Sequence, residues 1–468
     1  MNRAIQKLVL VGASGLLLAG CARVRTSTPT PAAPLPGAYA AGQQDGAIRM
    51  DKADLSRWYR SFGDPLLDSL VERAVAGNLD LRIARERARE ARAVRGYTAA
   101  TRRLPDAGLS GGASERGGGM SSNFGSRDSN LYQTGFDASY ELDLFGGARA
   151  GVAAADADAQ ATDEAARNAL VTVVAETARS YLELRQAQER LEVARQSLHA
   201  QEESLRLTEL RRDAGLTSDF DTTRAKAQVE STRAGIPLLE AQAQRSIHAV
   251  ALLLGQQPQA LQAELAAPGA MPASPPEVPV GLPSDLLRRR PDVRQAEREI
   301  AGAAARVGVA ASNFYPKFSL TGSTGGQSGT LLNLLSGAAR IWSLGTSFSW
   351  GLLNYPATSA NLRAAESREQ QSLANYEKTV LTALKDVEDA LAAYSKENEC
   401  RPSLAQAVEA NRKAMEFARL RYDKGLSSFL EVLDAQRSLL SSEDALAQSR
   451  GAVNTNLVAL YKALGGGW

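Results

Sequence analysis

The chain alternates apolar and polar residues along one long stretch, Leu131 to Gly147. The even positions are apolar, aromatic or small: Tyr132, Thr134, Phe136, Ala138, Tyr140, Leu142 and Leu144. The odd positions are polar or glycine: Gln133, Gly135, Asp137, Ser139, Glu141 and Asp143. A period of two predicts a β-strand with one apolar face and one polar face.

A second stretch, Ile341 to Ala357, repeats this alternation 210 residues later. Its apolar set is Trp342, Leu344, Thr346, Phe348, Trp350 and Leu352. Strands of about ten residues with aromatic ends are typical of a β-barrel wall that spans a bilayer. The alternation by itself also fits a half-buried strand of a soluble β-sandwich. Two shorter, Gly-rich alternations predict further strands at residues 107–114 and 318–324.

Long segments poor in Gly and Pro predict helices over residues 64–103, 148–214, 219–254, 284–312, 357–424 and 429–464. Helix 148–214 would be about 100 Å long. It carries a leucine every seventh residue (Leu184, Leu191, Leu198, Leu205), with Ala187 and Ala194 three residues after the first two, which predicts a coiled-coil seam. Pro237 and Pro402 lie inside predicted helices, so we expect a kink at Pro237 and a kink or broken turn at 400–403.

Strands, helices and turns recur at a constant offset. At 210 residues, Gly135 pairs with Gly345, Arg211 with Arg421, Gly215 with Gly425, and Leu254-Gly255 with Leu464-Gly465. This shared frame predicts an internal two-fold repeat. The first unit would be residues 58–255 and the second 284–468, joined by a Pro-rich linker at 256–283.

The amino terminus has the features of a secretory signal. Arg3 and Lys7 precede an apolar segment that ends in Leu18-Ala19-Gly20-Cys21, a sequence that resembles the lipobox of bacterial lipoproteins. We therefore expect residues 1–20 to be a signal peptide, Cys21 to carry a covalent lipid, and residues 21–57 to be a Pro-rich tether. An ordinary secretory signal with an incidental cysteine is the alternative.

Composition narrows the class further. The formal net charge of +2 falls to zero without Arg3 and Lys7, so no nucleic-acid partner is predicted. Two His and two Cys leave little for metal or nucleophilic chemistry. No nucleophile–base set or Gly-rich phosphate loop is present, so we expect no cofactor and no enzyme. Cys400 receives no role.

Four strands cannot form a barrel alone, because lipid offers no water to satisfy sheet edges and known barrels have about eight strands or more. Several chains must share one barrel, and two, three or four copies would all meet that count. Long helices with an apolar seam, packed side by side, would continue the barrel as a tube. The predicted fold is an α+β membrane protein that forms a conduit.

Several motifs resemble the TolC-like outer-membrane efflux protein family, in its lipoprotein branch that serves resistance-nodulation-division pumps. They are YELDLFG at 140–146, GLPSDLL at 281–287 with RRPD at 289–292, FYP at 314–316 and LEVLDAQR at 430–437. The resemblance implies a homotrimer, with a twelve-stranded barrel continued by an α-helical coiled-coil barrel. It also implies the outer membrane of a Gram-negative bacterium, a periplasmic adaptor and an inner-membrane transporter.

Three residues after the second turn share one helix face: Leu430, Asp434 and Arg437. Spacing alone favours a solvated salt bridge between Asp434 and Arg437 on an outer face. The resemblance instead implies that they form, with Glu431, the periplasmic gate of a three-fold tube. Asp221 and Arg224 would be their partners in the first repeat.

Two further sets complete the predicted sites. The turns at Gly215-Leu216 and Gly425-Leu426 are the expected docking tips for the adaptor. Asp137, Glu141 and Asp143 would face the barrel lumen and favour cations.

Other functions remain open at this point. The same fold could serve type I protein secretion or metal export, and a trimeric coiled-coil surface adhesin is a rival from another class. Nothing in the sequence names the exported substrate.

Overall fold

The computed structural model describes residues 36, 39, 48–49, 55–116, 129–275, 278–279 and 283–468. The described residues divide into two compact units. The first holds Arg87–Thr162 and Gln295–Glu377, and the second holds the described parts of Ala33–Glu86, Asp163–Arg294 and Lys378–Trp468. Four helices contribute residues to both units. Cys21 and most of the predicted signal and tether lie outside the described residues.

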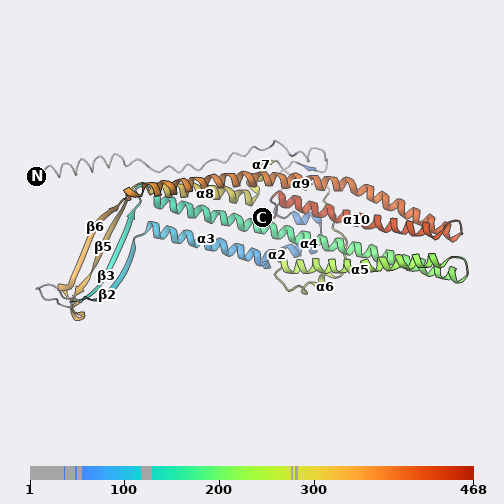
Figure 1. The fold of residues 1–468 in the computed structure, drawn as a ribbon, viewed down its shortest axis with the longest axis horizontal. Coiled ribbons are helices and arrows are strands. Elements are labelled where there is room, and N and C mark those ends of the chain that lie inside the picture. The colour runs from blue at the N-terminus through green and yellow to red at the C-terminus, as the bar shows by residue number, and fades with distance from the viewer. Residues whose placement is uncertain are drawn as a thin grey trace. The chain divides into compact units, whose positions relative to one another are not determined.

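The first unit contains a four-stranded antiparallel sheet (Figure 1). Its strands, in spatial order, are β2 (Asp106–Arg116), β3 (Ser129–Leu142), β5 (Lys317–Ser328) and β6 (Arg340–Ser349). Cross-strand pairing places Leu109, Phe136, Thr324 and Trp342 in one row across the sheet. The neighbouring row is Gly108, Asp137, Ser323 and Ser343. The predicted apolar and polar faces are therefore confirmed across all four strands.

Both long strands end earlier than predicted. β3 ends at Leu142, and β6 ends at Ser349. A short 3-10 helix at Leu352–Asn354 follows β6. Close backbone contact between β3 and β5 explains a glycine at the centre of the sheet. A Cβ on Gly325 would lie 2.1 Å from the Thr134 carbonyl oxygen.

Aromatic contacts lie where these strands meet their helices. The ring of Phe145 stacks on Tyr315 at 4.6 Å between centroids. Trp350 Nε1 donates to the Phe314 carbonyl at 3.0 Å. The DLFG and FYP motifs of the sequence thus meet in one packed junction within the first unit.

The first predicted helix, 64–103, is two helices, α2 (Pro65–Gly77) and α3 (Leu79–Arg103). Asn78 separates them with extended backbone angles. Its side-chain oxygen accepts from the Leu81 N–H at 2.9 Å, and its amide donates to the Leu253 carbonyl at 2.8 Å. Asn78 therefore begins α3 and also satisfies the end of another helix.

Two long helical hairpins supply most of the second unit. The first joins α4 (Gly147–Asp213) to α5 (Asp219–Leu253), and the second joins α9 (Tyr355–Asp423) to α10 (Phe429–Ala463). On α4 the predicted seam residues Leu184, Ala187 and Ala194 are buried, and the line of the two alanines continues at the buried Gln201 and Thr208. Pro237 and Pro402 lie inside helices that continue through them. The helix is therefore not broken at 400–403, and the predicted kinks at Pro237 and at 400–403 stay predictions.

The end of each hairpin is closed by the same kind of contact. Arg290, of the RRPD motif, donates to the Ala463 carbonyl at 3.0 Å, just as Asn78 donates to Leu253. Ala463 is the position in the second repeat that corresponds to Leu253 in the first, at the offset of 210 residues. Arg290 also pairs with Asp292 at 2.6 Å and Asp386 at 3.2 Å, which ties α8 (Pro291–Ser312) to α9.

The segment between the two predicted repeats is packed rather than extended. It contains α6 (Gln262–Leu265), and strand β4 (Val278–Pro279) pairs in parallel with β1 (Ile48–Arg49). α7 (Pro283–Arg289) follows. Leu261 and Leu265 are fully buried. Within the described residues, none of the helices combines the length and the apolar character needed to cross a bilayer.

Candidate functional site

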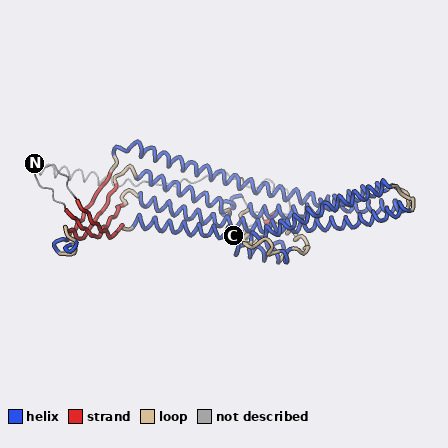
Figure 2. The backbone as a smooth tube through the Cα atoms, turned by 60° about the horizontal axis from the view of Figure 1, so that its bottom comes forward, coloured by secondary structure: helices blue, strands red, loops and turns tan. Residues whose placement is uncertain are grey.

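Each long hairpin reverses direction through a short loop (Figure 2). The two turns have the same backbone geometry. Gly215 and Gly425 adopt left-handed φ angles of 73° and 70°. Leu216 donates its N–H to the Arg211 carbonyl, and Leu426 donates to Arg421, each at 2.8 Å. This is the glycine-dependent helix end that lets the chain reverse.

The leucine after each glycine is exposed, at 76% for Leu216 and 68% for Leu426. A Cβ added to Gly215 or Gly425 would meet nothing within 4 Å. Both predicted tips therefore present an apolar side chain on an open turn.

Arg211 links the two hairpins at this end of the second unit. Its guanidinium donates to the carbonyls of Tyr422 and Asp423, both at 2.9 Å, and lies 4.4 Å from the centre of the Tyr422 ring. A cation at the last carbonyls of a helix is favoured by the helix dipole. Arg211 was not among the site residues predicted from the sequence, although the matching Arg421 in the second repeat indicated that the position matters.

An apolar cluster lies beneath this contact. Phe429, Val432 and Leu433 of α10 pack with Ala418 of α9 and Ala225 of α5. Because these residues bury one face of α10, the opposite face is left exposed in the single chain.

The predicted gate residues occupy that exposed face. Leu430 is 43% exposed, and Glu431, Asp434 and Arg437 are exposed. Glu431 lies 3.9 Å from Arg421 across the turn. Three of the four therefore remain available to groups outside this chain, as a shared gate needs.

Asp434 and Arg437 do not form the salt bridge that their spacing allows. Arg437 Nε donates to Gln228 of α5 at 2.6 Å. Among the described residues Asp434 has no ion pair or hydrogen-bond partner, and the terminal nitrogens of Arg437 have none either. Gln228 was not predicted, because no local pattern on α5 marks it.

The first-repeat residues are engaged locally. Asp221 accepts from the hydroxyls of Thr217 at 2.7 Å and Ser218 at 3.1 Å. Ser218 in turn caps α5 by accepting the Asp221 N–H. Arg224 lies 4.4 Å from the centre of the Phe220 ring. Their predicted pairing with the gate residues is not formed within one chain and stays a prediction between chains.

One of the predicted lumen charges is a helix cap. Asp143 follows the end of β3, and its carboxylate accepts from the N–H groups of Ala148 and Arg149 at 3.1 and 3.0 Å and from Arg149 Nε at 2.9 Å. Burial acts to raise the pKa of Asp143, but these hydrogen bonds outweigh it and lower the pKa. Asp143 thus lies one residue beyond the end of β3 and caps α4, and its predicted place at the barrel lumen stays a prediction.

Asp137 and Glu141 remain on β3. Asp137 accepts from the Ser110 hydroxyl of β2 at 2.7 Å and shares the polar face with Ser323. Glu141 is exposed and lies opposite Ser319 of β5. Both carboxylates fit the predicted polar face.

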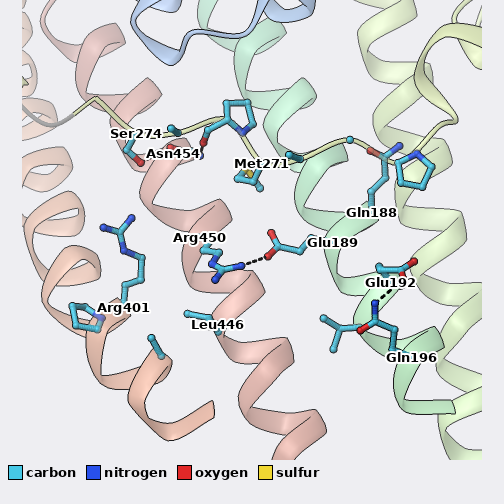
Figure 3. Close-up of a pocket in the computed structure, with 18 residues that line it drawn as sticks. Gln188, Glu189, Glu192, Gln196, Met271, Ser274, Arg401, Leu446, Arg450 and Asn454 are labelled. Carbon is cyan, nitrogen blue, oxygen red and sulfur yellow. Dashed lines mark hydrogen bonds and ion pairs between the residues drawn. The ribbon is translucent and has the colours of Figure 1, made fainter. Parts of the chain in front are cut away.

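A cavity of about 850 Å³ lies within the second unit, away from the tips (Figure 3). α4, residues 268–274, α9 and α10 line it, with Pro402 at one wall. Arg450 and Glu189, which face each other there, are paired at 2.7 Å. None of the predicted site residues lines this cavity.

The sequence and the structure were compared with those of known proteins. The model of the outer membrane efflux protein family matches residues 70–256 and 282–466. The chain is 35% identical to the solvent efflux pump outer membrane protein SrpC of Pseudomonas putida, over 97% of both chains. It is 32% identical to the probable outer membrane lipoprotein SilC of Salmonella typhimurium, over 99% of both.

A solved structure agrees in fold as well. The outer-membrane channel OprN superimposes with a TM-score of 0.89 at 38% identity, covering 95% of this chain and 100% of that one. The protein belongs to the outer membrane efflux protein family. The predicted family, the outer-membrane localisation and the role in efflux are thereby confirmed.

Proposed function

We propose that three copies of this chain form one twelve-stranded barrel in the outer membrane. The observation that carries the proposal is the sheet, whose β2 and β6 edges have no further strand beside them among the described residues. An unpaired edge in lipid leaves backbone groups unsatisfied. Pairing β6 of one copy with β2 of the next removes both edges.

The helical hairpins continue this barrel as a coiled-coil tunnel on the periplasmic side. The equivalent turns and the equivalent contacts of Asn78 and Arg290 support a duplicated unit, with repeats at 58–255 and 284–468. The first 20 residues are then a signal peptide, and lipid on Cys21 together with tether 21–57 anchors each copy. The similarity to a probable outer membrane lipoprotein supports this anchor.

The protein acts as a passive exit duct in a tripartite pump. A periplasmic adaptor contacts Gly215, Leu216, Gly425 and Leu426 at the tips, and an inner-membrane transporter supplies the energy. The duct itself does not select the substrate. No enzyme activity or cofactor is needed for this role, and the similarity to solvent efflux proteins favours small molecules over proteins as cargo.

The second tip forms the gate of the duct. In a three-fold tube, three copies of Leu430 narrow the opening, and three Asp434 carboxylates repel one another unless each is paired. The terminal nitrogens of Arg437 pair with Asp434 of a neighbouring copy, while Nε donates to Gln228 of its own chain. Asp221 and Arg224 of the first tip flank this ring, and Glu431 adds charge beside it.

Detergent-solubilised protein tests the proposal. We expect a trimer that dissociates on heating and conducts ions in a planar bilayer, with a mild preference for cations from Asp137 and Glu141. A chain that stays monomeric and non-conducting after insertion contradicts it. Anion-selective current would contradict only the role of these two carboxylates. Replacing both tip leucines by Ala should weaken pump assembly while barrel insertion is unchanged.

A further inference from the structure

We propose the register in which neighbouring copies pair: β6 of one chain runs antiparallel to β2 of the next, with Gly345 opposite Ser114 and Ser349 opposite Ser110. This inference rests on the proposed trimer and specifies its subunit interface. It follows from the strand pairing inside one chain and from the offsets between the repeats.

The strands of the two repeats correspond at slightly different offsets. β3 corresponds to β6 at 210 residues, as in Gly135 and Gly345. β2 corresponds to β5 at 211 residues, because Pro105, Leu109, Ser110 and Gly111 match Pro316, Leu320, Thr321 and Gly322. The hairpin registers require this extra residue. Ser139 pairs with Asp106, but its equivalent Ser349 pairs with Lys317, which lies 211 residues after Asp106.

The contact between repeats inside the chain is the pairing of β3 with β5. There Gly135 lies opposite Gly325, and Ser139 lies opposite Thr321. Shifting each partner by its own offset turns these pairs into Gly345 opposite Ser114 and Ser349 opposite Ser110. Because β6 and β2 form the two edges of the sheet, these partners can come only from different copies.

The faces of the sheet provide an independent check. The apolar row contains Leu109 on β2 and Trp342 on β6, so apolar positions are odd-numbered on β2 and even-numbered on β6. Residues opposite each other in a ladder share a face. The proposed register places Phe348 opposite Gly111, both apolar-face positions. A uniform offset of 210 would place Phe348 opposite Gly112, on the polar face.

Side-chain size fits the same register. On the apolar face the large Phe348 lies opposite Gly111, and Thr346 lies opposite Ala113. An aromatic ring beside a strand glycine covers backbone that would otherwise be exposed. On the polar face Ser347 lies opposite Gly112, and two serines, Ser349 and Ser110, face each other.

Disulfide cross-linking tests the register in the full-length protein. In a Cys400→Ser background, Ser110→Cys is combined with Ser349→Cys, and outer membranes are oxidised with copper phenanthroline. Within one chain these two positions lie on strands β2 and β6, which are separated by three inter-strand spacings of about 4.8 Å each. This separation is too large for a disulfide. Only neighbouring copies can therefore be linked, and closure of the ring should yield a covalent trimer on non-reducing denaturing gels.

Two matched variants shift one partner by two residues within the strands: Ser110→Cys with Ser347→Cys, and Gly112→Cys with Ser349→Cys. Diagonal neighbours lie about 7–8 Å apart, beyond ordinary disulfide reach, so we expect less than about one tenth of the cross-linking. Efficient linking of a shifted pair, or no linking in protein that is still a trimer on native gels, overturns the register alone. A monomer on native gels overturns the proposed assembly instead.

Discussion

The two hairpin tips have the same turn and different surroundings. Gly215 and Gly425 end their helices with equivalent hydrogen bonds, and an exposed leucine follows each. The first tip satisfies its polar groups locally, through Asp221 and its two hydroxyl partners. The second tip leaves Asp434 without a partner among the described residues. The two repeats thus share the backbone geometry of their turns, but the side chains around the two turns differ.

This difference explains why only one tip is suited to be a gate. A gate must change state, so its polar groups should find partners between copies rather than within one chain. Asp434 and the terminal nitrogens of Arg437 meet that requirement. Asp221, by contrast, already accepts hydrogen bonds from two hydroxyl groups of its own chain at the start of α5.

The largest expected effect comes from removing the charges of the second tip. Asp434→Ala with Arg437→Ala should raise single-channel conductance and antibiotic entry. The coupling energy of a close charge pair between subunits is about 1.5 kcal/mol or more, so its loss should raise the open fraction about tenfold. Planar-bilayer recordings measure this.

The matched control removes an exposed charge from the first hairpin, with Lys226→Ala on α5. Its conductance should equal that of the unmodified protein. Equal currents through the unmodified protein, the double variant and the Lys226→Ala control would contradict a gate at the second tip. They would not contradict the proposal that the protein is a channel.

A smaller effect separates the two equivalent arginines. Arg211→Ala should destabilise the second tip by about 2 kcal/mol, because two hydrogen bonds from a charged donor are lost. Arg421→Ala removes only an exposed ion pair at 3.9 Å and should cost less than about 1 kcal/mol. Hydrogen exchange of the amides at 420–430 in the purified trimer reports both. Equal protection in the two variants would contradict the linking role of Arg211.

The smallest effect concerns the helix caps. Ser218 accepts the Asp221 N–H, whereas Ser428 makes no side-chain cap. Ser218→Ala should therefore destabilise the start of α5 by about 1 kcal/mol, and Ser428→Ala should change α10 by less than about 0.3 kcal/mol. Amide exchange at the first turn of each helix distinguishes them. A larger loss in Ser428→Ala would contradict the assignment.

Periodic features were predictable from the sequence. The alternation of apolar and polar residues from Tyr132 to Leu142 predicted the strand β3 and its two faces. Gly215 and Gly425 predicted the positions of the two turns. These features depend on neighbours along the chain, which a sequence displays directly.

Features that depend on distant partners were missed. Asn78 separates α2 from α3, and its amide donates to the Leu253 carbonyl on another helix. Asp143 has the parity of a lumen residue, yet its carboxylate is held by the start of α4. Arg437 binds Gln228 rather than its neighbour Asp434, since packing of α10 on α5 places that amide closer. None of these partners is marked by local spacing.

The central claim is that the second tip, and not the first, forms the constriction. Leu430 and Phe220 occupy equivalent positions in the two repeats, so each can be replaced by Cys in a channel that lacks Cys400 and is opened by Asp434→Ala and Arg437→Ala. Single-channel recordings with cadmium should show reversible block of the Leu430→Cys channel, where three thiolates converge, and unchanged current through Phe220→Cys. Block at Phe220→Cys with an unaffected Leu430→Cys channel would contradict the account.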